Sequence, residues 1–272
     1  METKTLADIV HNTRIKTYPD GSQIVTVASA PIFREPGWEL SDKWDKEPRP
    51  ASEQSERAGE AEDRERARRR ARAAVADLGR SNAFTHFVTL TLDASKINRY
   101  DEAITREELR RWLSHQVQRR GLLYVLVPER HQDGAIHFHG LINNVFQLVD
   151  SGTIKLPGQK KPRRPRSAAQ RAAWLENGGH ICYNIPAWPY GFTTVYELYG
   201  EYRKAVGYVC KYIGKDSEKI GGRYYFSGGD LRRPEKSYTD TDFAAMEAET
   251  GAARFMIPRL GCQCINVEMD DV

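Results

Sequence analysis

The sequence is short of cysteine and of long apolar runs, and each shortage excludes a class of protein. Only 4 of the 272 residues are cysteine, which is too few for a disulfide framework and fits a reducing cytoplasm. The longest apolar run, Leu122–Val127, is far below the roughly 20 residues that span a bilayer. The first residues include Glu2 and Asp8 and no apolar stretch. We therefore expect no secretory signal, no membrane partner and a cytoplasmic location.

A strong excess of charge of one sign is also missing. Lys and Arg number 41 and Asp and Glu 37, so the formal net charge is +4, too small a total to indicate a nucleic-acid partner. The distribution is more informative. Six arginines lie within Arg64–Arg72, and seven basic residues without an acid lie within Lys155–Arg171. We expect both blocks to supply phosphate contacts that do not read base sequence.

Local patterns predict an α+β fold. Alternating apolar residues predict strands at 87–93, 122–129 and 135–142. A helix at 104–121 is expected to begin with a capping box of Thr105 and Glu108 and to end at Gly121. Composition and turn signals predict a hairpin at 13–17 and 23–28, helices at 51–78 and 201–216, and a strand at 223–229.

The order strand, helix, strand, strand, helix, strand is ferredoxin-like, or RRM-like. It predicts an antiparallel sheet with helices on one face. We expect three parts: an N-terminal hairpin and charged helical arm at 1–80, a central domain at 81–234 with a basic insertion at about 150–190, and an acidic C-terminal tail at 235–272.

A candidate metal site lies on the second and third of these strands. His137 and His139 stand two apart, so both imidazoles project from one face. A three-residue loop ending at Gly134, with that glycine in the left-handed conformation, places Glu129 directly across from His137. A two-residue loop would send the carboxylate to the other face. Two imidazoles and a carboxylate suit Mn²⁺, Zn²⁺ or, less ideally, Mg²⁺, with positions left open for substrate oxygens.

A second cluster lies on the helix predicted at 201–216. Tyr208, Tyr212 and Lys215 follow one helical face, and Lys211 lies near its edge. A phenol with its ordinary pKa near 10 needs help from a cation, a metal or a base to act as a nucleophile. A lysine one turn away can stabilise the phenolate. Packing of the two tyrosines in the core is the structural alternative.

Three motifs together resemble a known family. FVTLTLD, PERHQDGAIHFHGLI and GYVCKYIGKD are similar, in this order, to the first, metal and nucleophile motifs of the HUH endonucleases. These enzymes initiate rolling-circle replication, and the resemblance is closest to phage and plasmid replication-associated proteins of the Y-x-x-K-Y-x-x-K type. It covers about Phe84–Pro234.

The resemblance implies a ferredoxin-like nickase that cleaves single-stranded origin DNA by tyrosine attack, joins the 5′ phosphate covalently, leaves a 3′-OH and later religates the strand. It implies a divalent cofactor, Mg²⁺ or Mn²⁺, a bacterial host cell, and a host helicase and polymerase as partners. No G-x-x-x-x-G-K-[ST] motif of a helicase domain occurs. By the same resemblance the metal ligands are Glu129, His137 and His139, the nucleophiles Tyr208 and Tyr212, and their helpers Lys211 and Lys215.

Other functions remain open at this stage. A mobilisation relaxase or an HUH transposase would share the chemistry, and a non-catalytic module that binds single-stranded nucleic acid would use the same histidines and tyrosines structurally. The sequence YIGKD around Tyr212 also resembles the single-tyrosine form of the motif. Tyr183, Trp188 and Tyr190 are candidate stacking platforms for bases, with packing in the core as the alternative.

Overall fold

The structure, a computed structural model, describes residues 10–36, 53–159, 161–198, 202–214, 218–257 and 260–270, and for residues 53–59 it describes the backbone alone. The chain forms two compact units. The larger is Gln54–Arg232, and the smaller combines Met1–Glu53 with Arg233–Val272. None of the helices in the described ranges has the length and apolar composition that a bilayer crossing requires.

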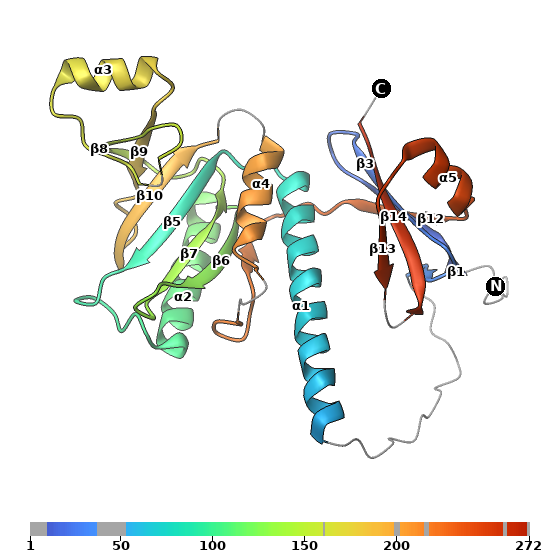
Figure 1. Cartoon of the computed structure of the whole chain (residues 1–272). Coiled ribbons are helices and arrows are strands. Elements are labelled where there is room, and N and C mark those ends of the chain that lie inside the picture. Colours follow the sequence, from blue (N-terminus) through green and yellow to red (C-terminus); the bar gives the residue numbers. More distant parts are fainter. Residues whose placement is uncertain are drawn as a thin grey trace. The chain divides into compact units, whose positions relative to one another are not determined.

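A seven-stranded antiparallel sheet lies at the centre of the larger unit (Figure 1). Its strand order is β11-β6-β7-β5-β10-β9-β8. The strands are β5 (His86–Leu92), β6 (Tyr124–Arg130), β7 (Ile136–Ile142), β8 (Val149–Lys155), β9 (His180–Asn184), β10 (Gly191–Glu197) and β11 (Phe226–Gly228). The helices of this unit are α1 (Glu53–Ser81), α2 (Glu102–Arg120), α3 (Ala168–Glu176) and α4 (Tyr202–Lys211). The α+β class and the antiparallel sheet expected from the sequence are confirmed.

Helices cover both faces of this sheet, whereas the sequence pattern predicted helices on one face. One face packs against α2 through a buried cluster that includes Leu90, Leu109 and Phe138. The other face packs against α1 and α4. The reason is that β6 and β7 are apolar on both sides, so the face with Val125 and Leu141 also has to be covered.

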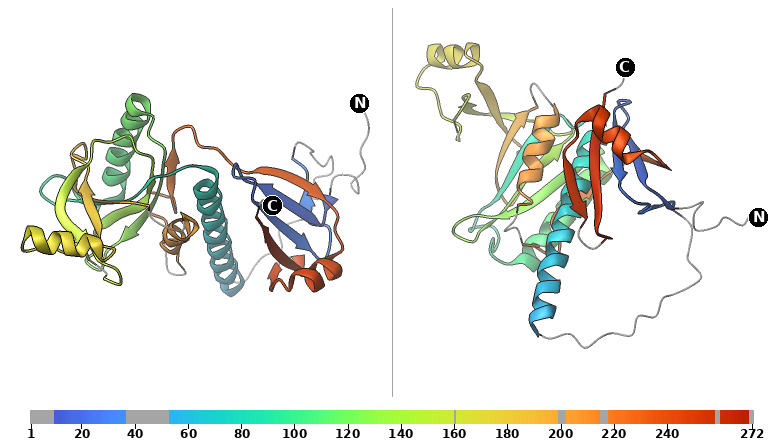
Figure 2. Two further views of the ribbon diagram at one scale, coloured as in Figure 1. Left: turned by 90° about the horizontal axis from the view of Figure 1, so that it is seen from above. Right: turned by 45° about the vertical axis from the view of Figure 1, so that its right-hand side comes forward.

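Strand order also departs from the expected ferredoxin-like pattern. The strand that follows α4, β11, pairs with β6 at one side. The place beside β5 is taken by β10, which comes before α4 in the chain. The region between 150 and 190 extends the sheet further, since β8 and β9 pair with each other and β9 pairs with β10. Helix α3 lies within this insertion and stands beyond the sheet in both views of Figure 2.

Two local predictions about α2 have different outcomes. Gly121 ends the helix in the left-handed conformation, with a φ of 67°, as predicted. The predicted start is wrong by one turn, because Asp101 is the N-cap and its carboxylate accepts from the backbone N–H groups of Ala103 and Ile104. Thr105 already lies inside the helix, where its hydroxyl donates to the carbonyl of Asn98. The earlier, acidic N-cap therefore adds a turn to the helix.

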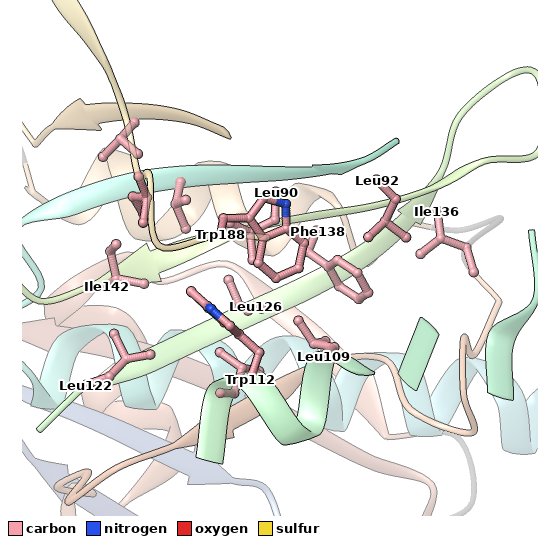
Figure 3. Packing of buried hydrophobic residues seen from close by; sticks show 14 of the residues in the cluster. Leu90, Leu92, Leu109, Trp112, Leu122, Leu126, Ile136, Phe138, Ile142 and Trp188 are labelled. Atoms are coloured by element: carbon pink, nitrogen blue, oxygen red, sulfur yellow. The ribbon is translucent and has the colours of Figure 1, made fainter. Parts of the chain in front are cut away.

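The aromatic residues before β10 belong to the core. Trp188 is buried and meets Trp112 edge to face, with 4.9 Å between ring centroids (Figure 3). Tyr183 and Tyr190 pack against the same cluster, and the hydroxyl of Tyr190 donates to Glu108. The packing alternative therefore holds for Tyr183, Trp188 and Tyr190.

The smaller unit joins the two ends of the described chain in one sheet. Its strand order is β12-β2-β3-β14-β13, and every pair is antiparallel. The predicted hairpin is present as β2 and β3. The last residues, expected as a separate tail, instead form three strands and a helix that cover Val25 and Val27. The elements are β1 (Val10–His11), β2 (Thr13–Thr17), β3 (Gln23–Ala28), β4 (Phe33–Arg34), β12 (Glu235–Thr239), α5 (Phe243–Thr250), β13 (Arg254–Ile257) and β14 (Cys262–Met269).

Candidate active site

The hairpin of β6 and β7 has the register predicted from its turn. Glu129 pairs with His137, and Val127 pairs with His139. Gly134 has a φ of 84°, and its N–H donates to the carbonyl of His131 at 2.8 Å, which closes the turn. The left-handed glycine thus fixes the loop length, and the loop length places Glu129 on the same face of the sheet as the two histidines.

Side chains from three strands meet on this face. The carboxylate of Glu129 lies 2.9 Å from Nε2 of His139. The neighbouring strand β5 contributes Thr89 and Thr91, which pair with His139 and His137 across the ladder. The Thr89 hydroxyl lies 3.1 Å from Nδ1 of His139, and the Thr91 hydroxyl lies 3.3 Å from Nδ1 of His137. Each hydroxyl holds one ring nitrogen, so Nε2 of each ring is left to face the site.

These contacts set the charge of the site. The hydrogen bond from His139 is the main cause that lowers the pKa of Glu129, so the carboxylate stays ionised. Burial is the main cause that lowers the pKa of His137, and the imidazoles of His139 and His131 add to it. A neutral imidazole and an ionised carboxylate are the forms that bind a metal.

The tyrosines reach the same face from α4. Tyr208 lies in the helix and Tyr212 follows its last residue, with its backbone N–H donating to the carbonyl of Val209. The Tyr212 ring stacks on His139, with 4.1 Å between centroids and 7° between planes. The Tyr212 hydroxyl donates to the Tyr208 hydroxyl at 3.0 Å. Phe87 of β5 contacts the Tyr208 ring edge to face.

Tyr212 is held in its neutral form by these surroundings. Burial is the main cause that raises the pKa of its phenol, and the hydrogen bond with Tyr208 and the charge of Glu129 raise it further. A cation close to the phenol oxygen is therefore needed to favour the phenolate. Lys211, exposed at the end of α4, is one candidate. Lys215 lies outside the described residues.

The donor set fits a divalent metal in kind. Glu129 and the two histidines offer one carboxylate and two imidazoles, and the threonines orient the rings as the outer shell of a metal site does. Within the described ranges, however, no three His, Cys, Asp or Glu side chains are arranged as a closed metal-binding group. In this structure the carboxylate instead bonds to His139.

Helix α1 supports the back of α4. Val75 and Leu78 of α1 are buried against Val206 and Val209 of α4. The hydroxyl of Tyr202, at the start of α4, donates to the carbonyl of Gly79 at 2.8 Å. The arginine-rich segment predicted as an arm is thus continuous with a helix that anchors the tyrosines.

Three residues of β5 that face the site were not predicted from the sequence. Thr89, Thr91 and Phe87 alternate on one side of the motif FVTLTLD, and this alternation was the available signal. Their contacts with the histidines depend on β5 lying beside β7, and that neighbour relation is a property of the whole sheet.

Comparison with known families adds one finding. A family model described as replication-associated protein, of the ORF2 type, matches residues 85–217. This part of the chain is similar to replication-associated proteins. The match is just under half of the 272 residues, runs from β5 through α4 and includes every candidate site residue. It is consistent with a role in initiating replication. No curated protein and no solved structure gives a significant match.

Proposed function

We propose that the protein is a replication initiator endonuclease that nicks single-stranded DNA at a rolling-circle origin. The proposal rests on one observation above all, which is that Tyr212 stacks on His139 and bonds to Tyr208. Two hydroxyl nucleophiles thereby share one face of the sheet with a carboxylate and two imidazoles. The similarity of residues 85–217 to replication-associated proteins supports the same function.

The metal-ligand set is Glu129, His137 and His139. A divalent ion, Mg²⁺ or Mn²⁺, would supply Lewis-acid stabilisation of charge on the phosphate oxygens. Thr89 and Thr91 keep the imidazoles turned toward the site. The stack between His139 and Tyr212 fixes the phenol next to this set without making the tyrosine a ligand.

The chemical step is an exchange of phosphodiester bonds. A phenol loses its proton to solvent, its oxygen attacks phosphorus, and the P–O bond to the 3′ oxygen breaks. The 3′ oxygen takes a proton from water and becomes a 3′-OH, and the 5′ side remains joined to tyrosine. Lys211 stabilises negative charge on the phenol oxygen and on the pentavalent phosphorus. Attack of a 3′-OH on the phosphotyrosine reverses the step and religates the strand.

The product sets the partners. A 3′-OH at the nick is the primer for a polymerase, and unwinding ahead of it requires a helicase. We propose that the host supplies both. Arginines of α1 and basic residues of the insertion hold the strand through phosphate contacts.

A covalent-adduct assay tests the proposal. The full chain is incubated with Mn²⁺ and labelled single-stranded DNA tiled across the replicon that encodes it, and the products are separated on a denaturing gel. We expect a protein–DNA band that disappears in the Tyr208→Phe/Tyr212→Phe variant and persists in Tyr100→Phe, a matched change at an exposed tyrosine outside α4. DNA binding without a band from any tile would support the non-catalytic binding module instead.

A further inference from the structure

A surface pocket lies between α1 and α4, to one side of the tyrosines. At about 100° per residue, Gly207 lies about 100° around α4 from Tyr208, and Lys211 lies about 60° around in the same direction. Lys211 therefore stands between the tyrosine face and the pocket. The lining residues are Arg72, Gly207, Cys210, Lys211, Ile213 and Gly214.

The polar groups of this pocket call for an anion. Arg72 and Lys211 bring two positive charges, and no acidic side chain belongs to the described lining. In the described part of the chain, the Nε–H of Arg72 is buried and has no hydrogen-bond partner. A buried donor without an acceptor is costly. Arginines elsewhere share this feature, but Arg72 lines a pocket together with a second cation.

Gly207 is unexplained by packing. Glycine in the middle of a helix is unfavourable relative to alanine, and here a Cβ would meet nothing within 4 Å. The residue is therefore not glycine to let another part of the protein come close. It does leave the floor of the pocket bare, which suits close approach of a ligand to the backbone.

The walls of the pocket are held together firmly. Gly79 of α1 is packed so tightly against Val206 that a Cβ at this glycine would lie 2.4 Å from a Val206 methyl carbon. On the pocket side, the Cys210 thiol donates to the carbonyl of Arg72 at 3.7 Å. Arg72 is thus fixed in place relative to α4 before any ligand binds.

We propose that this pocket binds a phosphate group of the single DNA strand, next to the phosphate that the tyrosines attack. The inference rests on the proposed function, because a strand laid along α4 reaches the pocket and the tyrosines through Lys211. It assigns a binding residue, Arg72, that lies outside the region similar to replication-associated proteins.

Salt-dependent binding of labelled dT20 tests this inference. The full chain is titrated in EDTA at several salt concentrations, so the result does not depend on nicking. Arg72→Ala should weaken binding about tenfold at low salt. It should also make the slope of log K against log salt shallower by about 0.7, the value for one lost phosphate contact on single strands. Arg110→Ala, a matched change on the opposite face of the sheet, should change neither.

Gly207→Ala provides the second arm. The added methyl group should leave the Tm unchanged or higher, because it clashes with nothing and favours the helix, but it should weaken dT20 binding several-fold. Inorganic phosphate as competitor separates the sources. Displacement of dT20 only at concentrations that act through ionic strength supports a strand site, and displacement at lower concentrations in wild type but not in Arg72→Ala would overturn it in favour of free phosphate.

Two results contradict the inference. One is an Arg72→Ala salt slope equal to that of Arg110→Ala, and the other is unchanged binding by Gly207→Ala. Either result would leave the nicking proposal standing, since the adduct assay is separate. A wild-type chain that binds no dT20 would overturn both proposals.

Discussion

The imidazole of His139 and the phenol ring of Tyr212 lie face to face, 4.1 Å apart and within 7° of parallel. This stack joins the strand that carries the candidate metal ligands to the helix that carries the candidate nucleophiles. It also distinguishes the two tyrosines, because Tyr208 contacts Phe87 instead and its side chain is 49% exposed.

The first prediction follows from that difference. We expect Tyr212→Phe to abolish the first nick, because Tyr212 is the tyrosine in contact with the ligand set. Tyr208→Phe should retain the first nick and lose the transfer of a second strand. Adduct formation and strand transfer are measured on the same labelled strand in a denaturing gel. Full first-strand cleavage by Tyr212→Phe would reverse the order of the two residues.

The second prediction concerns the hydroxyl groups of β5. Thr89→Val keeps the shape of the side chain but removes the hydrogen bond to Nδ1 of His139. Loss of such an outer-shell contact should lower Mn²⁺ affinity by about 10- to 100-fold, measured by calorimetry with the full chain. Thr91→Val should act in the same direction through His137.

A neighbouring threonine gives the matched control. Thr194 of β10 pairs with Thr89 on the same face of the sheet, one strand farther from the histidines. Thr194→Val should leave Mn²⁺ affinity unchanged. Equal losses in Thr89→Val and Thr194→Val would show that the effect comes from the strand and not from the hydrogen bond.

The third prediction is a pH dependence of stability. His86 is buried at the start of β5, and burial lowers its pKa, against a smaller opposing effect of Glu197. The folded state therefore binds this proton less readily than the unfolded state. Its contribution to stability is complete above the unfolded pKa of about 6.5 and is lost as the pH falls below that value.

Urea unfolding between about pH 5 and 7.5 measures this effect. Wild type should lose stability toward the acid end of the range, and His86→Gln should show a weaker loss. His115→Gln, at an exposed position of α2, should follow wild type. A His86→Gln curve parallel to wild type would assign the acid sensitivity to other groups.

The fourth prediction concerns Gly140, which lies between His139 and Leu141 in β7. A Cβ at this position would lie 1.9 Å from the carbonyl oxygen of Val125, a backbone atom that cannot move without displacing β6. Gly140→Ala should cost about 1–3 kcal/mol or more of unfolding free energy, measured by urea denaturation. Gly207→Ala, where a Cβ meets nothing within 4 Å, is the control. Equal stability of these two variants would contradict the contact.

Features with a local physical cause could be predicted from the sequence. The register of β6 and β7 follows from one left-handed glycine, Gly134, so Glu129 and His137 could be paired from the loop alone. The helix stop at Gly121 has the same kind of cause. The start of that helix shows the limit of local patterns, since Asp101 and Thr105 both offer a capping side chain and only the structure distinguishes them.

The remaining contacts depend on chain segments that meet only in the folded state. Thr89 and His139 are 50 residues apart, and their hydrogen bond requires β5 to pair with β7. The side chain of Asn82 bonds to the backbone carbonyl and N–H of Arg232, 150 residues away. No periodicity within one segment reports such neighbours, so the outer shell of the site and the support of α4 could not be predicted.

The sheet of the smaller unit has a consequence for synthesis on the ribosome. Its strand β3 ends at Ala28, and β14, which pairs with it, ends at Met269. All residues of the larger unit are made before β14 emerges, so that unit can fold while β3 still lacks this neighbour. Until then the apolar side chains Val25 and Val27 stay without the cover that β14 later provides. The first strands to be made are therefore among the last to be completed, and the nascent chain is most exposed to aggregation at its oldest end.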